Sequence, residues 1–508
     1  MHIKKSRPRP DRSAYQPLLS EDWRESLGKL SPSDPTAKFN SLVRELGRRP
    51  SYMPTDTELS ILISECMFRG KVKPLSNLLA QVPLQTLEIS SPANEHAWRT
   101  LLEAMPASNS VSQLTVSKLI LSKQEFDWAS TSLLFELLGQ LPDLKSLNFK
   151  SCTVRLSAPP DPPSCPPLLE LRNLHFEDTN KPFNLALELL NACANLSGFH
   201  LDTNHGIDEG EHDSLAEALS DRHALTLQEL TLRYLRDEKC VLSYSVLIKN
   251  AAALHHVDLS LNELSSSTLQ NLKEVLSGKT GLTSLSLAGC CPASDEMFYE
   301  KQVARIVSLE SLVSLDLSLN KFPSSMKPVL MAITSHPRLQ SLNLCDVTMS
   351  GELVTDVLPI ILEKNTTLIS LKLLTLKDSD FARLVVAMNQ NHSLRSLSIP
   401  NLERRLSTVS AEESHRLFPN YLALMGRVAL NERAWEIAVM EGPMQVVLGS
   451  MSGIAPKRVF LDVARYAAGH VAAEGTGNEA MALSLVNKEA HEKSLAGLAA
   501  LKRLHERK

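Results

Sequence analysis

The nine residues 312–320, Leu-Val-Ser-Leu-Asp-Leu-Ser-Leu-Asn, decide the fold of this chain. Leu312, Leu315 and Leu317 have the spacing L-x-x-L-x-L, and Asn320 follows them. We find this spacing of apolar residues twelve times, with first positions at residues 84, 111, 144, 171, 196, 227, 254, 282, 312, 339, 368 and 394. The eleven intervals span 310 residues, a mean of about 28, which is the period of a stacked structural repeat.

Helical patterns lie between these motifs. Residues 268–276 place Leu269, Leu272 and Leu276 on one face of a helix. The chain therefore resembles the leucine-rich repeat family, and specifically its ribonuclease-inhibitor-like branch. The resemblance implies an α/β fold: a right-handed leucine-rich-repeat solenoid, a horseshoe of about twelve repeats with a parallel concave sheet, followed by a small all-α C-terminal unit. The repeat style of residues 363–371 is also similar to that of bacterial type III secreted leucine-rich-repeat effectors.

Charge divides the chain into parts. Residues 1–50 carry 11 basic and 6 acidic residues, residues 51–400 carry 28 and 39, and residues 401–508 carry 14 and 12. We predict a disordered basic N-terminal segment over 1–50, a helical N-terminal cap over 51–83, the repeat domain over 84–402 and a helical C-terminal domain over 403–508, in which a helix starts at Pro419. The acidic body argues against nucleic-acid binding, since phosphate contacts need a basic face.

In the resembled family, the position three residues after the last strand leucine is usually Asn or Cys, whose side chain bonds backbone groups in the bend after the strand. We expect this ladder role for Cys152, Thr179, Asn204, Asn262, Cys290 and Asn320. Two interruptions are interpreted as loops: the proline-rich stretch 158–167 and the acidic stretch 205–213.

Residues that alternate with the buried leucines face the concave surface. Charged and imidazole groups concentrate there in repeats four to seven, and we predict that they bind a partner protein with a basic surface: His175, Glu177, His200, Asp202, Glu229, Arg233, His256 and Asp258. Charge reversal at Glu177, Asp202 and Asp258 is expected to weaken binding without unfolding the chain. A metal or acid/base site at His175 and His200 is the weaker hypothesis.

No P-loop, G-x-S-x-G or G-x-G-x-x-G motif occurs, and the eight cysteines form no C-x-x-C pair, so we predict no cofactor and no metal. The alternative function is a leucine-rich-repeat ubiquitin ligase or ligase adaptor that acts through the helical tail. It would lack a catalytic cysteine, since the last cysteine is Cys345. No apolar stretch is long enough to span a membrane. We expect a reducing, cytoplasmic location, or secretion by a Sec-independent route into a host cell.

Overall fold

The computed structural model describes residues 63–64, 66–81, 84–90, 92–105, 116–156, 164–202, 207–235, 237–291, 299–322, 326–347, 357–373, 378–400, 402 and 419–440. The chain divides into two compact units, Met1–Leu227 and Gln228–Lys508. Each unit is described by itself.

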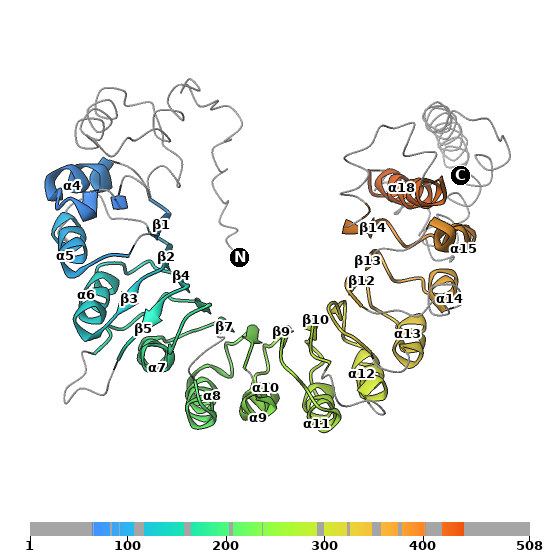
Figure 1. The fold of residues 1–508 in the computed structure, drawn as a ribbon, viewed down its shortest axis with the longest axis horizontal. Helices are drawn as coiled ribbons and strands as arrows, with labels where there is room; N and C mark the ends of the chain where they lie inside the picture. The colour runs from blue at the N-terminus through green and yellow to red at the C-terminus, as the bar shows by residue number, and fades with distance from the viewer. Residues whose placement is uncertain are drawn as a thin grey trace, which may run out of the picture. The chain divides into compact units, whose positions relative to one another are not determined.

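The first unit is a parallel sheet with its helices along one side of the strands (Figure 1). Its strands, in spatial and chain order, are β1 (Thr86–Ile89), β2 (Lys118–Ser122), β4 (Ser146–Lys150), β6 (Asn173–Glu177) and β7 (Gly198–Asp202). Its helices are α4 (Val72–Gln81), α5 (Glu95–Ala104), α6 (Trp128–Gly139), α7 (Phe183–Ala192) and α8 (Glu209–His223). A separate pair, β3 (Glu125–Phe126) and β5 (Thr153–Val154), is also parallel.

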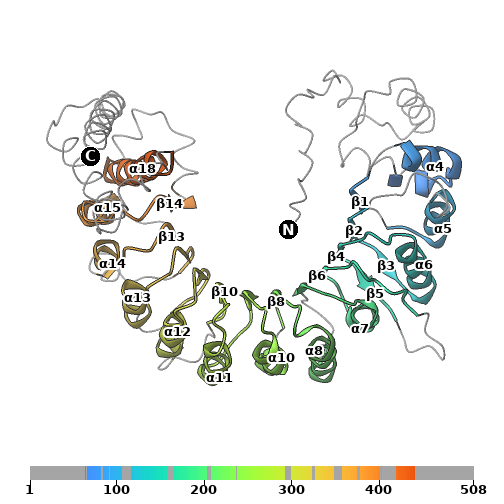
Figure 2. The ribbon, with the colours of Figure 1, turned by 180° about the vertical axis from the view of Figure 1, so that it is seen from behind.

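The second unit repeats this plan (Figure 2). Its strands, in order, are β8 (Glu229–Arg233), β9 (His256–Asp258), β10 (Ser284–Ser286), β11 (Ser314–Asp316), β12 (Ser341–Leu344), β13 (Ser370–Leu373) and β14 (Ser396–Ser398). Its helices are α9 (Glu238–Ser243), α10 (Ser245–Asn250), α11 (Ser266–Ser277), α12 (Tyr299–Val307), α13 (Lys327–Thr334), α14 (Leu358–Lys364), α15 (Asp378–Met388) and α18 (Pro419–Met440).

The leucines of the motif form the core between sheet and helices. In the repeat of β11, Leu312, Leu315 and Leu317 are buried, whereas the alternating Ser314 and Asp316 are only half-buried. Successive side chains of a strand point to opposite faces, so one face carries leucine and the other polar groups. A single strand–helix unit cannot enclose its own leucines, and stacking on the next repeat buries them. The predicted α/β leucine-rich-repeat solenoid with a parallel sheet is confirmed.

The predicted register of the second repeat is wrong. We expected Val111, Leu114 and Val116 as its motif, but the strand is Lys118–Ser122, and the buried set is Val116, Leu119 and Leu121. Residues 111–121 fit the L-x-x-L-x-L spacing in both registers. The structure adopts the one that buries two leucines and one valine and places Gln124 in the bend after the strand.

The interpretation of residues 205–213 as a loop is wrong from Glu209 onward, because α8 begins there. Asp208 is its N-cap: the carboxylate accepts a hydrogen bond from the Glu211 backbone N–H at 2.9 Å, and the Glu211 carboxylate accepts one from the Asp208 N–H at 3.0 Å. This reciprocal capping box satisfies two N–H groups that a helix start leaves open, and the acidic first turn suits the helix dipole.

Helix α18 starts at Pro419, as predicted, and packs on α15 as a further helix of the stack. The rings of Phe381 and Tyr421 meet edge to face with centroids 5.3 Å apart, and the Asn431 side chain donates to the Leu394 carbonyl at 2.8 Å. Helix α4 lies within the predicted N-terminal cap. The predictions for residues 1–50 and 441–508, for Asn204 and for most of the proline-rich stretch lie outside the described residues. None of the described helices is long and apolar enough to cross a membrane.

Candidate protein-binding face

The face of each sheet that points away from the helices is called the open face here. In the second unit its side chains form rows, because the parallel strands pair in register. The first row is Glu229, His256, Ser284, Ser314, Ser341, Ser370 and Ser396, and the central row is Thr231, Asp258, Ser286, Asp316, Asn343, Lys372 and Ser398. Side chains in one row lie on strands about 4.8 Å apart, so neighbours can bond laterally.

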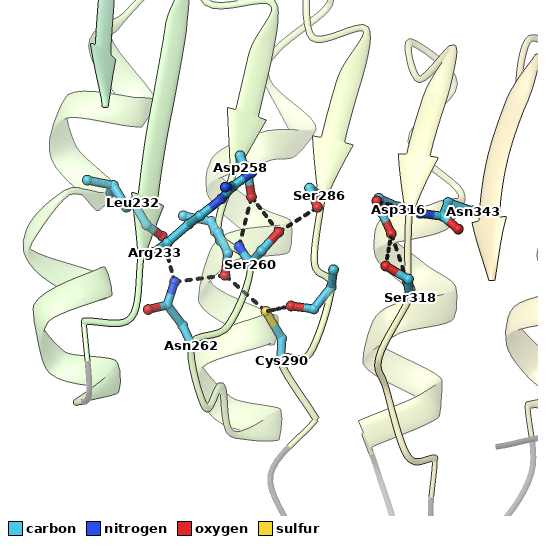
Figure 3. A network of polar contacts seen from close by, with 12 residues as sticks. Leu232, Arg233, Asp258, Ser260, Asn262, Ser286, Cys290, Asp316, Ser318 and Asn343 are labelled. Atoms are coloured by element: carbon cyan, nitrogen blue, oxygen red, sulfur yellow. Dashed lines mark hydrogen bonds and ion pairs between the residues drawn. The ribbon is translucent and has the colours of Figure 1, made fainter. Parts of the chain in front are cut away.

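Asp258 is the centre of a hydrogen-bond network in the central row (Figure 3). One carboxylate oxygen accepts from the Arg233 guanidinium, at 2.9 Å from Nε, and the other accepts from the Ser260 N–H at 2.9 Å and from the Ser260 hydroxyl. The Ser260 hydroxyl also bonds that of Ser286, at 2.7 Å. Asp258 is only 4% exposed, while the Arg233 side chain is 36% exposed. Burial alone would raise the pKa of Asp258, but the hydrogen bonds from Arg233 and Ser260 outweigh it and lower that pKa, so the pair is ionised at neutral pH.

The same Asp-Leu-Ser segment recurs two strands later without an arginine. Asp316 accepts from the Ser318 N–H at 2.8 Å and from its hydroxyl at 2.6 Å, and its second oxygen accepts from the Asn343 side chain at 2.8 Å (Figure 3). Asp316 is half-buried. Hydrogen bonds between segments of neighbouring repeats therefore hold four members of the central row, namely Asp258, Ser286, Asp316 and Asn343.

In the first unit, His175 and His200 pair in register and their rings stack with centroids 5.4 Å apart. Glu177 pairs in register with Asp202, and its carboxylate lies 3.0 Å from the Lys150 ammonium. Within the part of the chain that the structure describes, no group of three or more His, Cys, Asp and Glu side chains is placed to hold a metal ion.

The predicted binding residues divide between the units: His175, Glu177, His200 and Asp202 belong to the first, and Glu229, Arg233, His256 and Asp258 to the second. All eight lie on strands of the sheets. Asp258 departs from the expectation of a side chain exposed to solvent, because Arg233 and Ser260 draw its carboxylate into the network. Reversing its charge would break that network, so a charge-reversal experiment has to leave Asp258 intact.

The ladder residues bond backbone carbonyls in the bend after each strand. The Asn262 amide donates to the Leu232 and Leu259 carbonyls, both at 2.7 Å, and accepts from the Leu235 N–H at 2.8 Å. Asn320 makes the same three types of bond. A carbonyl of the preceding repeat accepts a hydrogen bond from each of the thiols of Cys152 and Cys290 and from the hydroxyl of Thr179.

Sequence reasoning missed a second ladder at the turn from helix to strand. The Asn365 amide donates to the Ile333 carbonyl at 2.8 Å and accepts from the N–H groups of Thr367 and Leu368. Asn391 does the same one repeat later, and the His336 ring bonds the Leu309 carbonyl and the Leu339 N–H. The signal is present in the sequence: each of these residues lies three positions before the first leucine of a motif.

Burial keeps the ladder thiols protonated at neutral pH. It raises the pKa of Cys152 to about 11 and the pKa of Cys290 to about 12, and it raises those of Cys165 and Cys193 to about 12 as well. The thiolate is the reactive form of cysteine, so these four side chains are structural rather than nucleophilic.

No family model and no curated protein matches the chain. Among solved structures, TLR13 in a TLR13–ssRNA13 complex is 18% identical, with a TM-score of 0.39, and the match covers 63% of this chain and 46% of TLR13. The leucine-rich repeat-containing protein LegL7 from Legionella pneumophila is 16% identical, with a TM-score of 0.34, and the match covers 69% of this chain and 94% of LegL7. The chain thus spans under half of the TLR13 chain. The fold assignment rests on the repeats and the strand register described above.

Proposed function

We propose that the chain is a protein-interaction scaffold that binds a partner protein on the open face of its leucine-rich-repeat sheets. The observation that carries the proposal is the in-register central row from Thr231 to Ser398, a set of polar side chains on a face that the described helices leave uncovered. Such a wall offers an extended surface with fixed spacing, which is how stacked repeats bind large ligands.

The network around Asp258 supports a binding role rather than a catalytic one. Its members are satisfied by one another, and Arg233, Ser260 and Ser286 hold the row in one arrangement. A side chain that is already ordered loses less conformational entropy when a partner binds.

Within this proposal the contact residues are the eight predicted from the sequence, and the partner presents a basic surface. Arg233 neutralises Asp258, so the acidity of this set rests on Glu177, Asp202 and Glu229. Lys150 partly offsets Glu177. Attraction between exposed charges weakens beyond about 8 Å at physiological salt, so partner binding should weaken as salt rises.

The proposal extends to the branch of the repeat family and to the kind of protein. Helices between successive strands favour the ribonuclease-inhibitor-like branch, and the repeat style of residues 363–371 favours a secreted bacterial effector that acts on a host protein. The ligase alternative depends on the helical tail, of which residues 441–508 lie outside the described part of the chain. No observation on the described residues favours it over a scaffold.

The test uses affinity purification with the full chain and mass spectrometry of the proteins retained. The open-face variant is Glu177→Lys with Asp202→Lys. The matched control, Glu217→Lys with Asp221→Lys, reverses two exposed charges on helix α8. We expect the same proteins with the wild-type chain and the helix variant, and their loss from the open-face variant. Retention of the same proteins by the open-face variant would contradict the proposal.

A further inference from the structure

One residue in the bend after each of the strands β8 to β12 adopts a left-handed backbone conformation. The φ angles are 56° at Tyr234, 64° at Leu261, 63° at Gly289, 61° at Leu319 and 56° at Asp346. These residues continue the rows of the sheet, because Leu261 N–H donates to the Ala288 carbonyl at 2.7 Å, Gly289 N–H to Ser318 at 2.8 Å, and Leu319 N–H to Cys345 at 2.8 Å. The five positions are therefore lateral neighbours at the carboxyl ends of β8 to β12.

Three of these positions carry apolar side chains at the surface. Tyr234 is 37% exposed and Leu319 is 49% exposed, while Leu261 is half-buried. A Cβ atom on Gly289 would lie 2.8 Å from Leu261 Cδ2 and 3.6 Å from Leu319 Cβ, so the Leu261 side chain occupies the space that glycine leaves. Tyr234, Leu261 and Leu319 thus form a nearly continuous apolar ridge.

Tyrosine and leucine are unusual residues for a left-handed backbone conformation. Clashes of Cβ with the backbone disfavour it for most residues, and glycine, asparagine and aspartate tolerate it best. The corresponding residues of the first unit, Lys123, Ser151 and Asp178, are polar. Leucine at an exposed left-handed position gains neither a local hydrogen bond nor full burial in compensation. Strain of this kind, retained where a better residue exists, points to a function in binding.

Negative charge surrounds the ridge. Four acidic residues, Asp258, Glu263, Asp316 and Asp346, and two basic residues, Arg233 and Lys321, lie in segments 231–235, 258–263, 286–291, 314–321 and 341–347. Asp258 and Arg233 neutralise each other, which leaves three acidic residues against Lys321 and a net charge of −2. Glu263 and Asp346 are exposed, and Asp346 lies beside Leu319 on the neighbouring strand.

We propose that this ridge is a docking site for a segment of a partner protein that presents apolar side chains flanked by lysine or arginine. The apolar side chains would cover Leu261 and Leu319, and the cations would meet Glu263 and Asp346. This inference rests on the proposed function, since it names the partner class for the same sheet. It places the contact at the strand ends, outside the eight binding residues predicted from the sequence.

Three fluorescein-labelled peptides of equal length test the proposal by fluorescence anisotropy with the full chain: one of leucine and arginine, one of leucine and glutamate, and one of serine and arginine. The ridge variant is Leu261→Asn with Leu319→Asn. The control is Ser151→Asn with Asp178→Asn, which places the same residue at left-handed positions of the first unit. We expect the wild type and the control to bind the leucine–arginine peptide at least tenfold more tightly than either other peptide, and the ridge variant to lose that preference.

Equal binding of the serine–arginine peptide, or an unchanged preference in the ridge variant, would contradict the proposal that the ridge is a docking site.

A failure of the ridge proposal can be told apart from a failure of the scaffold proposal. If Glu177→Lys with Asp202→Lys abolishes capture of the partner proteins while the ridge variant retains them and shows no peptide effect, the scaffold stands and the ridge does not. Asparagine suits the left-handed conformation, so the ridge variant should keep the circular dichroism spectrum and melting temperature of the wild type.

Discussion

Replacing Asp258 by alanine should destabilise the second unit more than the same change at Asp316. Asp258 is 4% exposed and accepts bonds from Arg233, the Ser260 N–H and the Ser260 hydroxyl. Its removal leaves a buried N–H without its acceptor and a guanidinium without its counter-ion. An unsatisfied buried group costs about 1–3 kcal/mol, and breaking a fully buried ion pair costs about 3–5 kcal/mol. Since the Arg233 side chain is 36% exposed, water screens part of that loss, and we expect about 3 kcal/mol in total.

Asp316→Ala is the matched control, because Asp316 has the same Asp-Leu-Ser context but is half-buried and bonds Asn343 instead of arginine. We expect it to cost about 1 kcal/mol. Urea unfolding at pH 7, followed by circular dichroism with the slope checked for each variant, measures both changes. An equal loss of unfolding free energy in the two variants would show that neither the ion pair with Arg233 nor burial makes Asp258 more stabilising than Asp316.

Three further expectations follow from buried groups. Asn262→Ala removes three hydrogen bonds at 2.7–2.8 Å and should cost about 3 kcal/mol in urea unfolding, whereas Cys290→Ala should cost about 1 kcal/mol because a thiol is a weak donor; equal costs would contradict the ladder role. Burial lowers the pKa of His212 from 6.5 to about 4, against the opposing effect of Asp208 and Asp213. Between pH 6.5 and 4 the unfolded chain therefore binds a proton at His212 that the folded chain does not bind. The free energy of unfolding should fall by about 3 kcal/mol as the pH drops through this range. In unfolding curves measured at each pH, His212→Gln should make that fall smaller. Cys290, whose pKa is raised to about 12, should resist iodoacetamide at pH 8 in peptide mapping of the folded chain and react in urea, and rapid labelling of the folded chain would contradict its burial.

The leucine spacing predicts the strands because side-chain direction in a strand has a period of two and the repeat recurs about every 28 residues. It predicts β11 and its neighbours correctly, and it fails at β2, where two overlapping motifs share Val116. Choosing between them needs the three-dimensional fit of the strand against its neighbours. The start of α8 can be predicted from the sequence, because Asp208 and Glu211 have the spacing of a capping box.

The sequence places the polar rows correctly on strands but does not predict their internal bonds. Whether Asp258 is exposed depends on Arg233, which lies 25 residues earlier and on the adjacent strand. The left-handed conformation of Leu261 and Leu319 is equally hidden, because leucine gives no local signal for it. Tertiary context fixes both features.

Site-specific photo-cross-linking tests the central claim that the open face binds a partner protein. A photoreactive residue is placed in the full chain at Glu229 or Lys372, which are exposed on open-face strands, or at Glu274, which is exposed on helix α11. After affinity capture and irradiation, mass spectrometry identifies the adducts. We expect partner adducts from the two strand positions and none from the helix position. Adducts from Glu274 alone would contradict the central claim.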